Sequence, residues 1–160
     1  MKEMSSSIQI MDTTIEDMPE ILALQKLAYL SEAILLDDFS IPPLMQTLDN
    51  IRADFHQGVI LKAIDTENGG DIIGSVRGYV NDNTLFVGKL MVHPDYQHQG
   101  IGTALLDAVE SRYPADRYEL FTSEKSVQNL RLYIKKGYQE YKREACNDHL
   151  DFVHLEKIKG

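Results

Sequence analysis

Two glycines stand one residue apart in the segment Gln97–Gly102, between a strand-like run and a helix-like run. The first N–H groups of a helix lack partners within the helix, and the helix dipole is positive there, so such a turn suits an anion. Gly100 and Gly102 have no Cβ and let the backbone approach a ligand closely. Gln97 and Gln99 add donors without adding charge. Together, these residue types suit a diphosphate.

The common nucleotide-binding loops do not match this turn. The dinucleotide fingerprint requires a third glycine where this chain has Ala104 and Leu105, and the P-loop requires Gly-Lys-Ser/Thr, which is missing. Gly-x-Gly by itself is a weak signal. At this point two interpretations stand, a diphosphate site or a tight turn whose glycines only begin a helix.

Few other side chains suggest chemistry on their own. Tyr133 could donate a proton, or it could be a core residue on the same helix as Leu130. Cys146 is the only cysteine and has no histidine framed around it, so we expect no disulfide and no acyl-cysteine intermediate. His149 and His154 lie five residues apart without an HExxH pattern, so we expect no metal site.

Hydrophobic periodicity places the turn in an ordered series of elements. Strands are predicted at 7–13, 59–64, 71–80, 84–92, 118–122, 138–143 and 150–155, and helices at 18–30, 43–57, 100–113 and 126–136, with irregular chain at 31–42. In the last helix, Val127, Leu130 and Ile134 are expected to face the core. The order βααβββαβαββ lacks the alternation of a Rossmann domain and predicts an α+β (mixed α/β) fold whose sheet is antiparallel in its middle.

Length and composition restrict the class of protein. The 160 residues suit one domain, residues 1–160, and no apolar run approaches the ~20 residues of a membrane span. No signal-peptide pattern is present at the start, so a reducing cytoplasm is the expected location. The net charge of −9 argues against nucleic acid and anionic membranes as partners. The charge is uneven, with ten acidic and three basic residues in 1–60, and six basic and three acidic residues in 124–144.

Two motifs resemble those of the GNAT acetyltransferase superfamily. The stretch LFVGKLMVHPDYQHQGIGTALLDAV resembles the family's central motif, in which a strand and a short loop lead to Gln/Arg-x-x-Gly-x-Gly/Ala at a helix start. Some thirty residues later, NLRLYIKKGY resembles the next motif, in which Asn precedes Leu-Tyr and Gly-Phe/Tyr. The resemblance implies a twisted, mostly antiparallel sheet of about seven strands, flanked by helices and splayed at the strand that holds acetyl-CoA.

The resemblance also implies roles for particular residues. The strand before the loop would pair its backbone with pantetheine at Leu90, Met91 and Val92, and one of their N–H groups would polarise the acetyl carbonyl. Asn129 would bind the pantetheine arm, although some members make this contact one helical turn earlier, where this chain has Ser126. Tyr133 would protonate the departing thiolate. The pyrophosphate would lie on the loop residues Gln97, His98, Gln99, Gly100, Ile101, Gly102 and Thr103.

The general base is left open by the sequence. An amine with a pKa of about 10.4 is almost fully protonated at pH 7, so some group must accept its proton. The candidates are Glu32, Asp37, Asp38 and Glu119, none of which lies in a pattern that can be transferred from the family.

The expected function is therefore N-acetyl transfer from acetyl-CoA to a primary amine, by direct attack in a ternary complex. Because residues 1–60 are acidic, the acceptor is expected to be a small cationic molecule. Two alternatives remain, acetylation of a protein N-terminus or lysine, and a regulatory module that binds acetyl-CoA without turnover. We expect no metal, no nucleic acid and no membrane partner, and a homodimer is left open.

Overall fold

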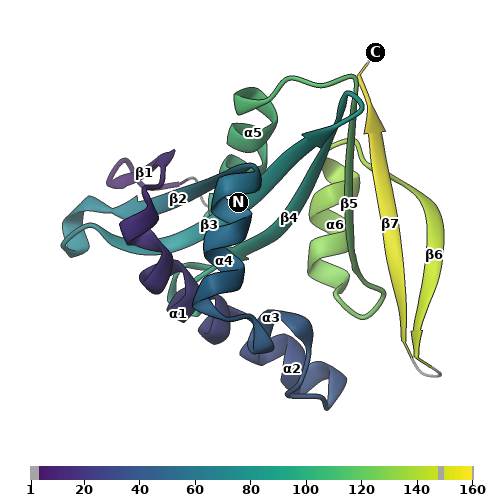
Figure 1. Cartoon of the computed structure of the whole chain (residues 1–160), viewed down its shortest axis with the longest axis horizontal. Coiled ribbons are helices and arrows are strands. Elements are labelled where there is room, and N and C mark those ends of the chain that lie inside the picture. The colour runs from purple at the N-terminus through teal and green to yellow at the C-terminus, as the bar shows by residue number, and fades with distance from the viewer. Residues whose placement is uncertain (1–3, 148–149, 160) are drawn as a thin grey trace.

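The computed structural model describes residues 4–147 and 150–159. In chain order the elements are β1 (Ile8–Asp12), η1 (Ile15–Asp17), α1 (Met18–Ala28), α2 (Leu30–Leu36), α3 (Pro42–Met45), α4 (Leu48–Gln57), β2 (Val59–Asp65), η2 (Thr66–Asn68), β3 (Asp71–Asn81), β4 (Thr84–Val92), η3 (Pro94–Tyr96), α5 (Ile101–Arg112), β5 (Arg117–Ser123), α6 (Val127–Lys135), β6 (Gln139–Asn147) and β7 (Leu150–Ile158). The α+β prediction is confirmed (Figure 1).

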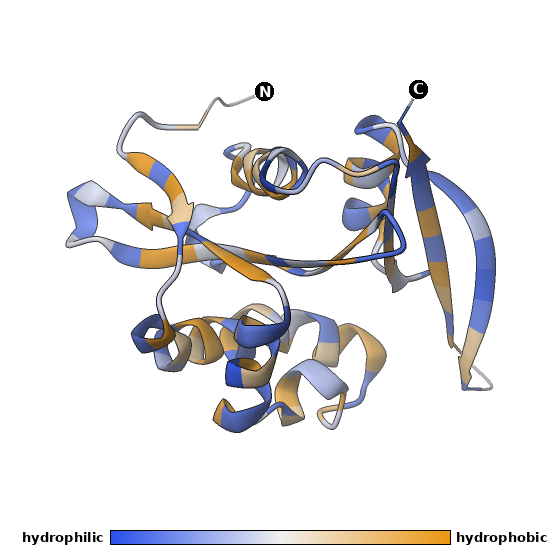
Figure 2. Cartoon of the chain, turned by 45° about the horizontal axis from the view of Figure 1, so that its top comes forward, coloured by the Kyte–Doolittle hydropathy of each residue, from blue (hydrophilic) through white to orange (hydrophobic). Residues whose placement is uncertain are grey.

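The strands form one seven-stranded sheet in the order β1-β2-β3-β4-β5-β7-β6. All neighbouring pairs within it are antiparallel except β4 and β5, which are parallel. In Figure 2, α5 lies above the sheet and α1–α4 lie below it. No helix in the described ranges is long and apolar enough to cross a membrane.

Two apolar clusters hold the layers together, one on each side of the sheet. The larger joins the sheet to α5 and α6, and it includes Leu105, Leu106 and Tyr133. The smaller joins it to α1 and α4, and it includes Met18 and Ile51. The sheet therefore separates two layers of different composition, and both layers reach β4.

Two glycines of β3 bring α5 close to the sheet. A Cβ added at Gly74 would lie 3.0 Å from Leu105 Cδ1, and one at Gly78 would lie 3.0 Å from Val109 Cγ2. Such contacts are tighter than close-packed interiors tolerate without a shift. The absence of side chains at these two positions therefore fixes how deeply α5 lies and where its N-terminus begins.

Three details of the predicted helices were wrong. The stretch 31–42 is not wholly irregular, because α2 occupies residues 30–36. The helix predicted at 43–57 is two helices, since Thr47 and Asn50 form a capping box that begins α4 anew. In α6 the side chains of Val127 and Ile134 are 52% and 60% exposed instead of facing the core. The predicted turn at Asn147-Asp148 lies partly outside the described residues, as does His149.

Candidate active site

The loop between β4 and α5 turns sharply through two left-handed residues. His98 has a φ of +63° and Gly100 a φ of +82°. Gly100 is the N-cap of α5, no side chain caps this helix, and its first turn holds no acidic residue. The first intrahelical bond runs from Ala104 N to Gly100 O at 3.0 Å. The N–H groups of the first turn are thus left for an external anion.

Gly102 has no packing role that requires a glycine. A Cβ there would lie 3.6 Å from Leu132 Cδ2 and 3.9 Å from Val92 Cγ2, which are ordinary contacts. Glycine inside a helix is less stable than alanine by about 1 kcal/mol. A ligand lying against the helix end gives a physical reason for the missing side chain.

Three contacts fix the orientation of this loop. The Tyr96 hydroxyl donates to Asp65 Oδ2 at 2.7 Å, which ties η3 to the end of β2. His93 N donates to Ile73 O at 2.8 Å, and Asp95 N donates to His93 Nδ1 at 3.0 Å. The end of α5 is therefore held in place against β2 and β3.

Strands β4 and β5 separate soon after they meet. They pair only from Thr84 to Phe86 on β4, opposite residues 117–119 on β5. Beyond this point β4 contains a bulge, with a register shift against β3 and a φ of +50° at Lys89. On its β5 side, the segment 90–92 has no strand partner among the described residues, so its backbone can pair with an extended ligand. The predicted splay is confirmed.

The residues predicted to bind the cofactor belong to β4, to the loop before α5, to the first turn of α5 and to α6. Leu90 and Val92 are partly buried against the larger cluster, and Met91 is buried in the smaller one. Asn129 is exposed on α6, one helical turn before Tyr133. The remaining residues belong to the loop and to the first turn of α5: Gln97, His98, Gln99, Gly100, Ile101, Gly102 and Thr103.

Tyr133 lies in the larger apolar cluster and is only 6% exposed. Its ring centroid is 6.1 Å from that of Tyr138. Burial raises the pKa of Tyr133, and the negative charge of Glu32 adds to this effect. Glu32 itself accepts a hydrogen bond from Ser126 Oγ at 3.2 Å. The Ser126 hydroxyl is therefore engaged, while Asn129 is exposed.

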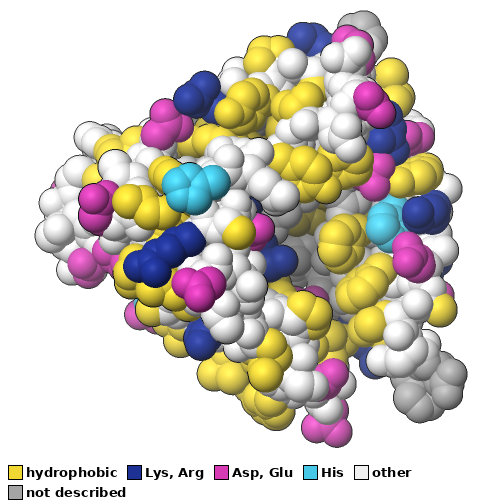
Figure 3. Space-filling model, in the orientation of Figure 1, with side chains coloured by type: hydrophobic (Ala, Val, Ile, Leu, Met, Phe, Trp, Pro, Cys, Tyr) yellow, Lys and Arg dark blue, Asp and Glu magenta, His cyan; other side chains and the backbone are white. Residues whose placement is uncertain are grey.

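A cavity of about 220 Å³ occupies the gap between β4 and β5. Its walls come from residues 87–89 of β4, residues 119–121 of β5, Arg77 and Tyr79 of β3, and Asp54 of α4. Figure 3 shows a hollow near the centre of this face of the molecule. The cavity touches β4 immediately before the unpaired segment 90–92, so it lies beside the backbone predicted to hold the thioester.

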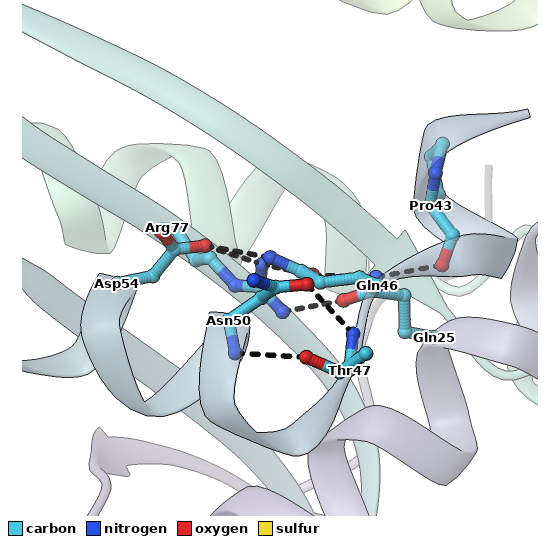
Figure 4. A network of polar contacts seen from close by, with 7 residues as sticks. All are labelled: Gln25, Pro43, Gln46, Thr47, Asn50, Asp54 and Arg77. Carbon is cyan, nitrogen blue, oxygen red and sulfur yellow. Dashed lines mark hydrogen bonds and ion pairs between the residues drawn. The ribbon is translucent and has the colours of Figure 1, made fainter.

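Arg77 lines the cavity and donates hydrogen bonds to several polar side chains around it (Figure 4). It is only 7% exposed and donates from Nη1 to Gln46 Oε1 at 3.0 Å and to Asp54 Oδ2 at 3.1 Å. It also donates from Nη2 to Gln25 Oε1. Its Nε is buried without a hydrogen-bond partner in the described structure.

Lys89 enters the same cavity from the bulge of β4. It is partly buried, and its ammonium forms no side-chain hydrogen bond or ion pair with any residue that the structure describes. Burial lowers the pKa of Lys89, and the neighbouring charge of Arg77 lowers it further.

Of the four carboxylates considered as bases, Glu119 lines the cavity. Its Oε1 is 2.7 Å from Arg117 Nη1, and its Oε2 is 3.9 Å from His154 Nδ1. Asp37 and Asp38 are exposed at the end of α2, and neither lines this cavity. Within the described ranges, no three His, Cys, Asp or Glu side chains are grouped to hold a metal ion.

The residues that the sequence analysis missed are Asp54, Arg77 and Lys89. Arg77 and Lys89 are basic residues within mostly apolar stretches of β3 and β4, and charged residues at such positions are a recognisable signal of a polar site. Asp54 gave no such signal, because it stands among polar residues of an ordinary amphipathic helix.

Comparison with known sequences identifies the family. Residues 45–159 match the model of the acetyltransferase (GNAT) domain. The UPF0157 protein YqkA of Bacillus subtilis (strain 168) is 31% identical over 122 residues, which are 76% of this chain and 34% of that protein. The chain thus spans about a third of the length of this curated relative.

Comparison with solved structures gives the same fold. The ribosomal-protein-S18-alanine N-acetyltransferase of Escherichia coli superposes with a TM-score of 0.77 at 15% identity, covering 94% of this chain and 93% of that one. The PaiA N-acetyltransferase of Thermoplasma acidophilum, solved with coenzyme A, superposes with a TM-score of 0.76 at 17% identity, covering 96% and 99%. The resemblance carried by the two sequence motifs is confirmed, and the chain belongs to the GNAT acetyltransferase family.

Proposed function

We propose that this chain, as one domain over residues 1–160, transfers the acetyl group of acetyl-CoA to a primary amine of a small molecule. The observation that carries the proposal is the parting of β4 from β5 after Phe86. It opens a cavity that has residues 87–89 of β4, which do not pair with β5, on one wall and the carboxylate of Glu119 on the other. The uncapped end of α5 follows the same strand by one loop.

Acetyl-CoA is held mainly by backbone in this proposal. The pyrophosphate accepts hydrogen bonds from the N–H groups of residues 98–103, with Gln97 beside them. Pantetheine pairs with residues 90–92 and reaches the exposed amide of Asn129. The relative from Thermoplasma acidophilum, of the same fold, was solved in complex with coenzyme A.

The reaction proceeds in one ternary complex. The amine nitrogen attacks the acetyl carbonyl carbon and forms a C–N bond, while an N–H group of residues 90–92 stabilises the oxyanion. Glu119 accepts the proton that the amine loses. The C–S bond then breaks, and the sulfur leaves as a thiolate that takes the phenol proton of Tyr133. The products are the N-acetylated amine and coenzyme A in its thiol form.

The raised pKa of Tyr133 suits proton transfer to a thiolate that is buried in the same apolar site. A phenol with a raised pKa stays protonated at neutral pH, but it gives its proton readily only to a strong base. Burial that destabilises the phenolate also destabilises a thiolate and raises the pKa of the thiol. Because burial raises the pKa of the thiol as well as that of the phenol, the raised pKa of Tyr133 does not by itself prevent the proton transfer.

The proposal also concerns the size of the acceptor, the location of the protein and its assembly. The acceptor is a small molecule, because the cavity is smaller than the roughly 300–1,000 Å³ of sites for drug-sized ligands. Acetylation of a protein is the alternative, and the Escherichia coli structure of the same fold is that of an enzyme for ribosomal protein S18. A cytoplasmic location stays a prediction from the sequence, and a homodimer stays a possibility that the sequence leaves open.

The test is thiol release from acetyl-CoA with a panel of amines, comparing the wild type with Glu119→Gln. We expect Glu119→Gln to lower kcat at pH 7 by about 10²–10³, because the loss of a general base costs of that order. Glu16→Gln, at an exposed position on η1, is the matched control and should behave as the wild type.

Two results would count against the proposal. If acetyl-CoA binds but no amine drives thiol release, the regulatory module without turnover becomes the better interpretation. If Glu119→Gln retains full activity, Glu119 is not the base, although the transferase assignment would stand.

A further inference from the structure

Two cationic side chains line one wall of the cavity, and one of them has no counter-ion in contact. Arg77 is buried and paired with Asp54, whereas the partly buried Lys89 forms no ion pair with any residue that the structure describes. A partly buried cation is stabilised by a contacting counter-ion, so the wall that holds Lys89 suits the anionic group of a ligand.

The charges around the cavity are separated by sign. Asp54 Oδ2 lies 3.1 Å from Arg77 Nη1 and neutralises its charge. Lys89 has no such partner in contact among the described residues. Across the gap, Arg117 is shared by Glu119 and Glu156, both at 2.7 Å, so one negative charge is in excess. The cavity is positive on its β3–β4 wall and negative on its β5 wall.

Other groups near Lys89 do not cancel its charge by contact. Asp54 and Glu32 stabilise the ammonium through space, while Arg77 opposes it. None of the three lies within ion-pair distance of Lys89. His154 faces Glu119 on the opposite wall and adds to that wall only when it is protonated.

We propose that the acceptor is a small amine that also carries an anionic oxygen group, a carboxylate or a phosphate. The anionic group binds Lys89, and the amine faces Glu119. This inference rests on the proposed function, since it names the substrate class of the same site. It narrows the expectation of a small cation, because the acidic residues of 1–60 lie mostly outside the cavity, whereas Lys89 and Arg77 lie in it.

The first experiment compares matched amines in the thiol-release assay with acetyl-CoA. Each amino acid in a panel is compared with its amide and with its decarboxylated amine, and 2-aminoethyl phosphate is compared with ethanolamine. We expect kcat/KM to be at least about tenfold higher for the preferred anionic member, as for one charge-assisted hydrogen bond. The two series distinguish carboxylate from phosphate.

The second experiment repeats the comparison with Lys89→Met, which keeps most of the length of the side chain and removes its charge. The preference for the anionic member should fall from at least about tenfold to about one. The dissociation constant of acetyl-CoA, measured in parallel, reports whether the variant is folded. Lys159→Met is the control, because it removes the same charge at an exposed position beyond the end of β7.

The outcomes separate this inference from the function on which it rests. Turnover of the amides and plain amines at rates equal to or above those of the anionic members overturns the inference and leaves the transferase intact. If no amine is turned over, the transferase proposal fails. The same matched pairs are then titrated by calorimetry in the presence of coenzyme A, where equal affinity within each pair overturns the anion site and tighter binding of the anionic member supports it.

Discussion

The proposed coenzyme side and the proposed acceptor side of this molecule are built differently. On the coenzyme side, the loop at 97–102 and the segment 90–92 offer backbone N–H groups from one short stretch of chain. On the acceptor side, the cavity wall is made of side chains from α4, β3, β4 and β5, which are distant in sequence. Backbone recognition requires a particular conformation, whereas side-chain recognition requires particular residues.

This difference explains why one site could be read from the sequence. A backbone site needs glycines and a helix start at fixed spacing, so it leaves a local motif. A side-chain site needs only that separate elements meet, so Arg77 and Asp54 carry no spacing signal. The comparison predicts that changes on the two sides should have separable effects on the two substrates.

The largest effect is expected from Gly102→Glu. The new carboxylate would stand at the uncapped end of α5, where the pyrophosphate is proposed to bind, and would repel it. We expect acetyl-CoA affinity to fall by at least about a hundredfold, the equivalent of two or more charge-assisted hydrogen bonds. Calorimetry measures the affinity, and circular dichroism checks that the helix is retained.

Gly102→Ala is the matched control for this change. It adds only a methyl group with ordinary contacts, and alanine stabilises a helix interior by up to about 1 kcal/mol relative to glycine. A higher Tm with weaker coenzyme binding would show that the ligand, not the packing, requires glycine. If Gly102→Glu binds acetyl-CoA as the wild type does, the diphosphate site does not lie at this helix end.

An intermediate effect is expected from Tyr133→Phe, which changes the catalytic step without touching either binding wall. We expect kcat to fall by roughly 10², at the lower end of the range for general acids, because solvent can also protonate the thiolate. Steady-state assays measure kcat, and titration with acetyl-CoA measures its dissociation constant, which should change little. Full activity in this variant would remove Tyr133 from the mechanism.

The smallest effect is expected from Glu32→Gln, which should change the stability of the fold. Glu32 accepts a hydrogen bond from Ser126 and lies near the charge of Lys89. Burial raises the pKa of Glu32, although Ser126 and Lys89 act in the opposite direction. The folded state therefore binds this proton more tightly than the unfolded state, so the free energy of unfolding falls as pH rises above the ordinary value of 4.5. The variant should be more stable at pH 7 by less than about 1 kcal/mol.

Chemical denaturation at several pH values measures this difference. The gain in stability of Glu32→Gln should vanish below about pH 4, where the wild-type carboxyl is protonated in both states. A gain that is independent of pH would mean that the ionisation of Glu32 does not cause it.

The sequence predicted the succession of strands along the chain and the turn that begins α5, because both depend on local patterns of residues. It missed α2, since Ile34 and Leu35 are apolar but exposed, and their spacing gave no inward face. It also placed Val127 and Ile134 on the buried face of α6, where only Leu130 of the three predicted residues packs against the larger cluster. There, Tyr133 packs inward while Ile134 is exposed, and only the position of the larger cluster decides between neighbouring apolar residues.

The cavity could be predicted only in part. Glu119 was one of four carboxylates considered as the base, and nothing in the sequence indicated that it lines a cavity between β4 and β5. The break between α3 and α4 was within reach, because Thr47 and Asn50 form a recognisable capping pair. That break matters to the site, since it lets Gln46 bond to Arg77.

The bulge of β4 makes Lys89 a position suited to redesign. A φ of +50° is one that asparagine, aspartate and glycine adopt with less strain than lysine does. Exchanging Lys89 for aspartate would therefore invert the charge of one wall while relaxing the backbone beneath it. This one substitution should favour acceptors with a second cationic group over acceptors with an anionic group, while the conformation of β4 is kept.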